Sequence, residues 1–98
     1  MIGHIVFYRM KPGTSEGDEN RLIDEARRRL PHIPGVRNLR AGKSFGGPEK
    51  GYSVALVMDF QDAAALEAYR VNADHQQFVK EIAEPLVEEI WRFDFQSE

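Results

Sequence analysis

The chain has 98 residues, with 13 basic and 16 acidic side chains that give a formal net charge of −3 at pH 7. This length fits one domain, and the lack of cysteine excludes disulfides, thiolate nucleophiles and cysteine-ligated metal sites. The acidic balance argues against a nucleic-acid partner, and the lack of a long apolar run or signal-peptide layout predicts a soluble, cytoplasmic, unprocessed protein without a membrane span.

A first strand is predicted over residues 4–10, where side chains alternate between two largely apolar faces. One face carries His4, Val6, Tyr8 and Met10. The other carries Ile5, Phe7 and Arg9. Pro12 and Gly13 end the strand, since proline donates no ladder hydrogen bond and glycine accepts a turn. Thr14 or Ser15 is then expected to cap a helix whose apolar residues recur at helical spacing, and which ends at Pro31 and Pro34.

Two further strands are predicted over residues 36–45 and 52–60, joined by a glycine-rich loop over 46–51. The third strand has the clearest alternation in the chain. One face carries Tyr52, Val54, Leu56, Met58 and Phe60. Asp62 is expected to cap a short helix that follows this strand.

The last third of the chain is predicted to contain a divided helical region and a final strand. Asn72 and Asp74 divide the helical pattern into two stretches, and Pro85 should interrupt or end the second. Residues 90–95 then alternate, with aromatic side chains on one face and Arg92 and Asp94 on the other.

The predicted order is therefore βαββαβ, which indicates a single α+β domain over residues 1–98 with a ferredoxin-like, four-stranded antiparallel sheet. Helices cover only one face of such a sheet, and the uncovered face should be polar. Here neither face is convincingly polar. Ile5 and Phe7 lie on the face of the first strand opposite His4, and Ala55 and Val57 lie on the face of the third strand opposite Leu56. We therefore predict a homodimer through the open sheet face, with the two sheets forming an α/β barrel.

Five segments in this order and spacing resemble the stress-responsive dimeric α/β-barrel (Dabb) family. They are residues 4–13, residues 33–36, Gly51-Tyr52, residues 66–69 followed by His75, and residues 93–95. The resemblance implies a ferredoxin-like protomer and a dimer whose sheets form a barrel. Relatives of this family include a plant polyketide cyclase that closes a ring in a pocket between sheet and helices.

The resemblance points to three candidate catalytic residues. The Tyr-x5-His acid/base segment of the cyclase is matched by Tyr69 and His75, and its first-strand histidine by His4. The family usually has His-Pro-x-His where this chain has residues 72–75, Asn-Ala-Asp-His. Imidazole can accept a carbon-bound proton near neutral pH, and a phenol can stabilise the enolate. The structural alternative is that His75 caps a helix, Tyr69 plugs the edge of the core, and His4 holds a backbone carbonyl.

A largely apolar small-molecule pocket is predicted on the same side of the sheet as His4. Its expected lining residues are Val6, Tyr8, Leu56 and Met58. The same pattern also describes a closed core. No cofactor is required, and no metal site is predicted, because no two histidines have helical or hairpin spacing. Three functions stay open: binding a small apolar, aromatic or polyketide-like molecule, cofactor-free cyclase or isomerase chemistry, and a structural stress protein without a ligand.

Overall fold

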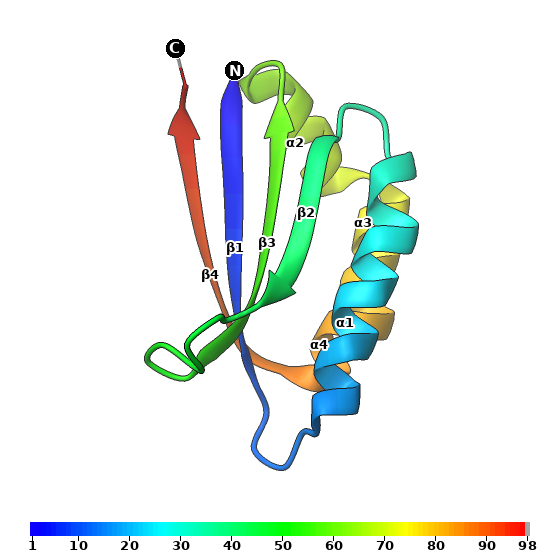
Figure 1. The fold of residues 1–98 in the computed structure, drawn as a ribbon. Coiled ribbons are helices and arrows are strands. Elements are labelled where there is room, and N and C mark those ends of the chain that lie inside the picture. Colours follow the sequence, from blue (N-terminus) through cyan, green and yellow to red (C-terminus); the bar gives the residue numbers. More distant parts are fainter. Residues whose placement is uncertain (98) are drawn as a thin grey trace.

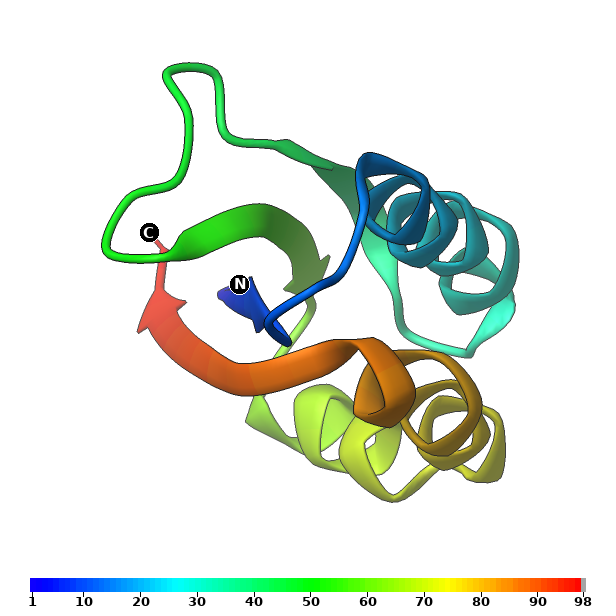
Figure 2. The same ribbon diagram turned by 90° about the horizontal axis from the view of Figure 1, so that it is seen from below.

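Four antiparallel strands form one sheet in the order β2-β3-β1-β4, and all helices lie on one side of it in the computed structural model (Figures 1 and 2). The structure describes residues 1–97, so Glu98, the last residue of the predicted domain, lies outside the described residues. The elements are β1 (Ile2–Met10), α1 (Glu16–Arg29), η1 (Leu30–His32), β2 (Arg37–Lys43), β3 (Tyr52–Phe60), α2 (Ala63–Val71), α3 (Ala73–Phe78), η2 (Val79–Ala83), α4 (Glu84–Leu86) and β4 (Val87–Gln96). The predicted βαββαβ order and ferredoxin-like α+β class are confirmed.

Helix starts follow the predicted caps. Ser15, rather than Thr14, caps α1: its hydroxyl accepts from the Asp18 amide at 3.2 Å, and the Asp18 carboxylate accepts from the Ser15 amide at 2.9 Å. Asp62 caps α2 by accepting from the Ala65 amide at 2.9 Å. Each cap satisfies an amide that has no partner within its helix.

Pro85 marks the end of the last helical region, as predicted, because that region stops at Leu86, one residue after the proline. The π-helical turn η2 carries the chain into α4, and Pro85 lies in that final turn. The amide of Glu84 bonds the carbonyl of Val79, five residues back, which widens the helix just before the proline. The chain then enters β4 at Val87, three residues earlier than predicted, while β2 is shorter than predicted at both ends.

The core lies between the sheet and the helices. Alternate residues of β1 and β3 point into it, together with one face each of α1, α2 and the α3–η2 region. Its largest fully buried side chains are Phe60, Phe78, Leu22, Leu30, Leu56 and Met58. The burial pattern confirms the predicted inward face of β3 for Val54, Leu56, Met58 and Phe60, which are all buried. The prediction is wrong for Tyr52, whose ring lies 6.1 Å from that of Trp91 on the opposite face, because the β1–β3 register shifts between Tyr8 and Arg9.

The opposite face of the sheet is uncovered and aromatic. Trp91, Phe93 and Phe95 of β4 are 56%, 59% and 41% exposed, and they lie opposite Phe7, Ile5 and Gly3 of β1. The Phe95 ring lies across Gly3, where a Cβ would come within 2.3 Å of it. We call Ile5, Phe7, Trp91, Phe93 and Phe95 the aromatic sheet face. Within residues 1–97, no helix combines the length and apolar character needed to cross a membrane.

Candidate ligand-binding cavity

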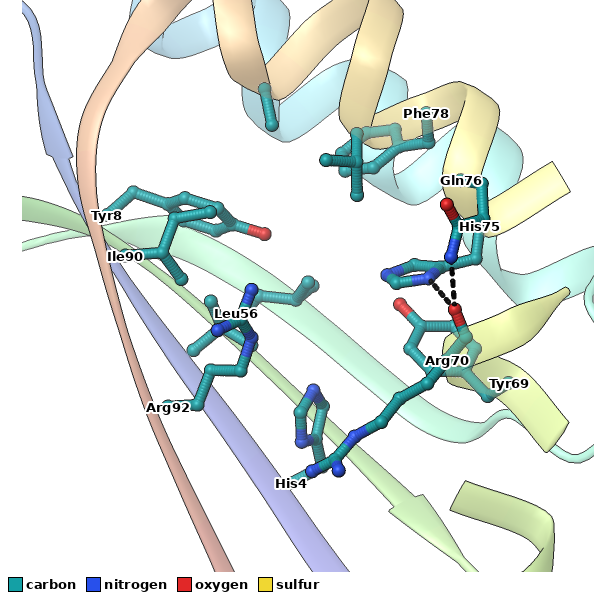
Figure 3. Close-up of a pocket in the computed structure, with 13 residues that line it drawn as sticks. His4, Tyr8, Leu56, Tyr69, Arg70, His75, Gln76, Phe78, Ile90 and Arg92 are labelled. Atoms are coloured by element: carbon teal, nitrogen blue, oxygen red, sulfur yellow. Dashed lines mark hydrogen bonds between the residues drawn. The ribbon is translucent and has the colours of Figure 1, made fainter. Parts of the chain in front are cut away.

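A cavity of about 420 Å³ lies between the helix-side face of the sheet and the helical region from α2 to η2 (Figure 3). Strands β1, β3 and β4 form its floor, while α2, α3 and η2 form its opposite wall. Its lining residues are His4, Val6, Tyr8, Leu56, Tyr69, Arg70, His75, Gln76, Phe78, Val79, Ala83, Ile90 and Arg92. The cavity therefore combines an apolar body with several polar groups, the usual character of a small-molecule site.

Most of the residues predicted for this site meet at the cavity. Val6, Tyr8 and Leu56 line its floor, and His4, Tyr69 and His75 border it. Met58 does not line it, and the prediction for this residue is wrong. Met58 lies opposite His4 in the β1–β3 register and is fully buried, so its side chain is part of the closed core.

His75 and Tyr69 are brought together by the turn between α2 and α3. The Asn72 side chain caps α3 by accepting from the amides of Asp74 at 2.8 Å and His75 at 3.3 Å. The two aromatic rings lie with centroids 4.2 Å apart at an angle of 38°. Asn72 thus anchors the start of the helix that presents His75, at the position where the family usually has a histidine.

The hydrogen bonds of His75 define which of its nitrogens faces the cavity. Its Nδ1 lies 3.2 Å from the Arg70 carbonyl oxygen, which also accepts from the Gln76 amide group at 2.9 Å (Figure 3). A carbonyl only accepts, so in this hydrogen-bonded tautomer Nδ1 carries the proton. Nε2 is then the basic nitrogen, and the ring projects into the cavity.

His4 is oriented by a carboxylate rather than by a backbone carbonyl. Its buried Nδ1 bonds the Asp94 carboxylate, and the second Asp94 oxygen accepts from Arg70 at 2.7 Å. His4 and Asp94 are direct partners in the β1–β4 register, which places both on the helix side of the sheet. The arrangement leaves Nε2 of His4 free toward the cavity.

Burial shifts the pKa values of three side chains that line the cavity, Tyr8, Tyr69 and His75. It raises the pKa of the Tyr8 phenol and the pKa of the Tyr69 phenol well above the ordinary value, against the opposing positive charge of Arg92. Burial also lowers the pKa of His75, although the bond to the Arg70 carbonyl acts in the other direction. At neutral pH the site therefore presents two protonated phenols and a neutral imidazole, which are suited to donate hydrogen bonds and to accept a proton.

The lowered pKa of His75 predicts a pH-dependent stability. Between the folded-state pKa and the unfolded value of about 6.5, the unfolded chain binds more protons than the folded one. The free energy of unfolding should therefore fall as the pH drops through this window. Above the window, the contribution of neutral His75 to stability is complete. Urea unfolding from pH 5 to 7.5 should show a smaller slope for His75→Gln. The matched variant His32→Gln removes an exposed histidine of η1 and should keep the original slope; equal slopes for all three proteins would contradict the assignment.

Four polar or charged lining and supporting residues were not predicted as part of the site: Asp94, Arg92, Arg70 and Gln76. The alternation of the last strand did place Arg92 and Asp94 on the face opposite the aromatic side chains. The register that sets Asp94 against His4 was the missing information. Among residues 1–97, no group of three or more His, Cys, Asp or Glu side chains is arranged to hold a metal ion.

Comparison with known families and structures agrees with the fold. The family model described as the stress responsive A/B barrel domain, Dabb, matches residues 2–97. A search of the curated proteins found no match. A Dabb family protein of Mesorhizobium loti with a ferredoxin-like fold is 28% identical, with a TM-score of 0.85 and coverage of 99% of this chain and 96% of that chain.

Two other solved structures are similar to this chain. A dimeric ferredoxin-like protein of unknown function from Jannaschia sp. is 25% identical, with a TM-score of 0.76 and coverage of 98% of each chain. A hydroxynitrile lyase from Passiflora edulis is 22% identical, with a TM-score of 0.80 and coverage of 96% of this chain and 90% of the enzyme. At this identity the enzyme shares the fold, which has hosted at least one catalyst.

Proposed function

The chain belongs to the stress-responsive A/B barrel domain (Dabb) family, and on this premise we propose that it is a homodimer that binds a small, largely apolar molecule between its sheet and helices. The observation that carries the proposal is the cavity of about 420 Å³. Sites for small molecules have volumes of about 300–1,000 Å³ and combine apolar walls with a few polar groups. The ligand class that fits this cavity is a small aromatic or polyketide-like compound.

The aromatic sheet face supports the homodimer. Large aromatic side chains gathered on one exposed surface mark an interaction site, since monomers rarely keep such a patch in water. A second copy would cover this face by packing sheet against sheet through a two-fold axis. The dimeric relative from Jannaschia sp. has the same protomer fold over nearly its whole length. Because the cavity lies on the other face of the sheet, ligand binding and dimerisation use different surfaces.

Cofactor-free acid–base catalysis is the second candidate, and the geometry of His75 favours it. Burial keeps its imidazole neutral, and its Nε2 is free to take a carbon-bound proton from a ligand in the cavity. The Tyr69 phenol would donate a hydrogen bond to the developing enolate, and His4 would orient the substrate. A cyclase, isomerase or lyase reaction fits these roles, and the similar Passiflora enzyme is a lyase.

The binding proposal is tested by thermal shift with a panel of aromatic acids and polyketide-like compounds. A ligand at about 100 times its Kd should stabilise the protein by about 2.7 kcal/mol, and raise its Tm by several degrees. Ile90→Trp should abolish the shift, because Ile90 lines the cavity and the larger side chain would fill it. Val71→Trp adds the same ring at a position 67% exposed on α2, and should preserve the shift.

The outcomes separate the three functions. A shift that survives His75→Ala and Tyr69→Phe, without turnover of the ligand, indicates binding alone. Turnover that both variants abolish indicates the enzyme. No shift for any compound in the panel would overturn the binding proposal and favour a structural role for the dimer.

A further inference from the structure

The cavity has a strongly biased charge. Two arginines line it, together with uncharged polar groups that include the neutral imidazole of His75, and none of its lining residues is acidic. The whole chain carries a net charge of −3, so this bias is local to the cavity. A guanidinium in the cavity that no carboxylate neutralises would favour an anionic ligand.

Only one of the two arginines forms ion pairs with other residues of the protein. Arg70 donates to Asp94 at 2.7 Å and lies 3.7 Å from the Glu67 carboxylate. Asp94 is the acidic group nearest in sequence to Arg92 on the same strand face, but both of its oxygens are occupied, one by His4 and one by Arg70. Asp94 therefore stabilises the edge of the site and is not available to neutralise Arg92.

The side chain of Arg92 makes no hydrogen bond or ion pair with any residue in the described part of the chain. It lies opposite Val6 in the β1–β4 register, on the helix side of the sheet, and its guanidinium projects into the cavity (Figure 3). Its positive charge acts on three cavity groups. It lowers the pKa of Tyr8 and of Tyr69 against the effect of burial, and it lowers the pKa of His75 together with burial. The guanidinium is thus central to the polar part of the site.

We propose that Arg92 is the recognition residue for a carboxylate on the cavity's ligand, so that the ligand class is a small aromatic or aliphatic acid. This inference rests on the proposed binding function and narrows it. A guanidinium offers two parallel N–H donors that match the two oxygens of a carboxylate. With the carboxylate on Arg92, the apolar body would lie against Leu56, Ile90 and Phe78, within reach of the Tyr8 and Tyr69 hydroxyls.

The test compares acids with their uncharged amides. Binding of benzoate, 3-phenylpropanoate and hexanoate, each beside its amide, is measured by calorimetry on the full chain. The best acid should bind at least tenfold more tightly than its amide. Arg92→Gln should erase this preference, Arg92→Lys should keep part of it, and both variants should keep the fold by circular dichroism, since Arg92 is exposed and packs no core. Arg21→Gln removes the same charge from the exposed side of α1, and should leave the preference unchanged.

Each remaining outcome has a defined meaning. Equal binding of acid and amide, unaffected by Arg92→Gln, would overturn the role of Arg92 while leaving the binding proposal intact. Tighter binding of phenyl phosphate than of every acid would overturn the carboxylate assignment, because the guanidinium fork also fits phosphate. Failure of all acids and amides to bind would overturn both this inference and the proposed function for these ligand classes.

Discussion

Phe93→Glu is expected to convert the proposed homodimer to a monomer at micromolar concentration. Phe93 is 59% exposed in the protomer and lies opposite Ile5 at the middle of the aromatic sheet face. In a sheet-to-sheet dimer the new carboxylate would be buried without a partner, at a cost of several kcal/mol. Since each 1.4 kcal/mol changes an equilibrium constant tenfold, the dimer Kd should rise by about two orders of magnitude or more. Light scattering coupled to size exclusion measures the change in mass.

Val71→Glu is the matched control for this variant. Val71 is also an exposed apolar residue, at 67%, but it lies on α2, on the helix side of the molecule. It introduces the same charge and should leave the dimer intact. Dissociation by both variants would indicate a general effect of charge, and an intact Phe93→Glu dimer would show that a different surface forms the interface.

Of the variants proposed here, Phe78→Ala is expected to lower the free energy of unfolding the most. Phe78 is 1% exposed, lies under the guanidinium of Arg29 at 6.0 Å, and forms part of the cavity wall. Removing a buried phenyl ring costs about 3–5 kcal/mol, because the lost transfer free energy is joined by the cost of the space left behind. A small domain has a total stability of about 5–15 kcal/mol, so this variant should be close to unfolding at room temperature.

Phe45→Ala makes the same chemical change at a residue that is fully exposed. Its free energy of unfolding should differ from the original by less than about 0.5 kcal/mol. Urea unfolding at one fixed protein concentration compares the two variants, since a dimer's stability depends on concentration. A loss of less than 1 kcal/mol for Phe78→Ala would contradict its place in the core.

The sequence predicted the fold well where local patterns coincide with tertiary structure. The bounds of β3 were predicted correctly, because its alternation is unbroken and one of its faces is buried. The start of β4 was missed, since Glu88 and Glu89 lie on an edge strand and pair with Arg9, so no apolar alternation marks them. Pro85 was predicted to interrupt or end the last helical region, and that region ends one residue after it. The widened π-helical turn before the proline was not predicted, because it leaves no signature in the residue types.

The site was predictable only in part, for a different reason. Alternation assigned His4 and Tyr8 to the helix side of β1, and the resemblance added Tyr69 and His75. Contacts between distant segments depend on register, and a register of two strands 90 residues apart is not encoded in either strand alone. The pairing of His4 with Asp94 was therefore visible only in the structure.

Binding of an acid in the cavity is tested most directly by an amide NMR titration of the protein with 3-phenylpropanoate. Saturable shift changes are expected at residues of the cavity wall and floor, centred on Tyr69, His75 and Arg92, while the amides of the aromatic sheet face stay unchanged. Shift changes confined to Trp91 and Phe93, or none up to millimolar ligand, would contradict the claim that the cavity between sheet and helices is the binding site for such acids.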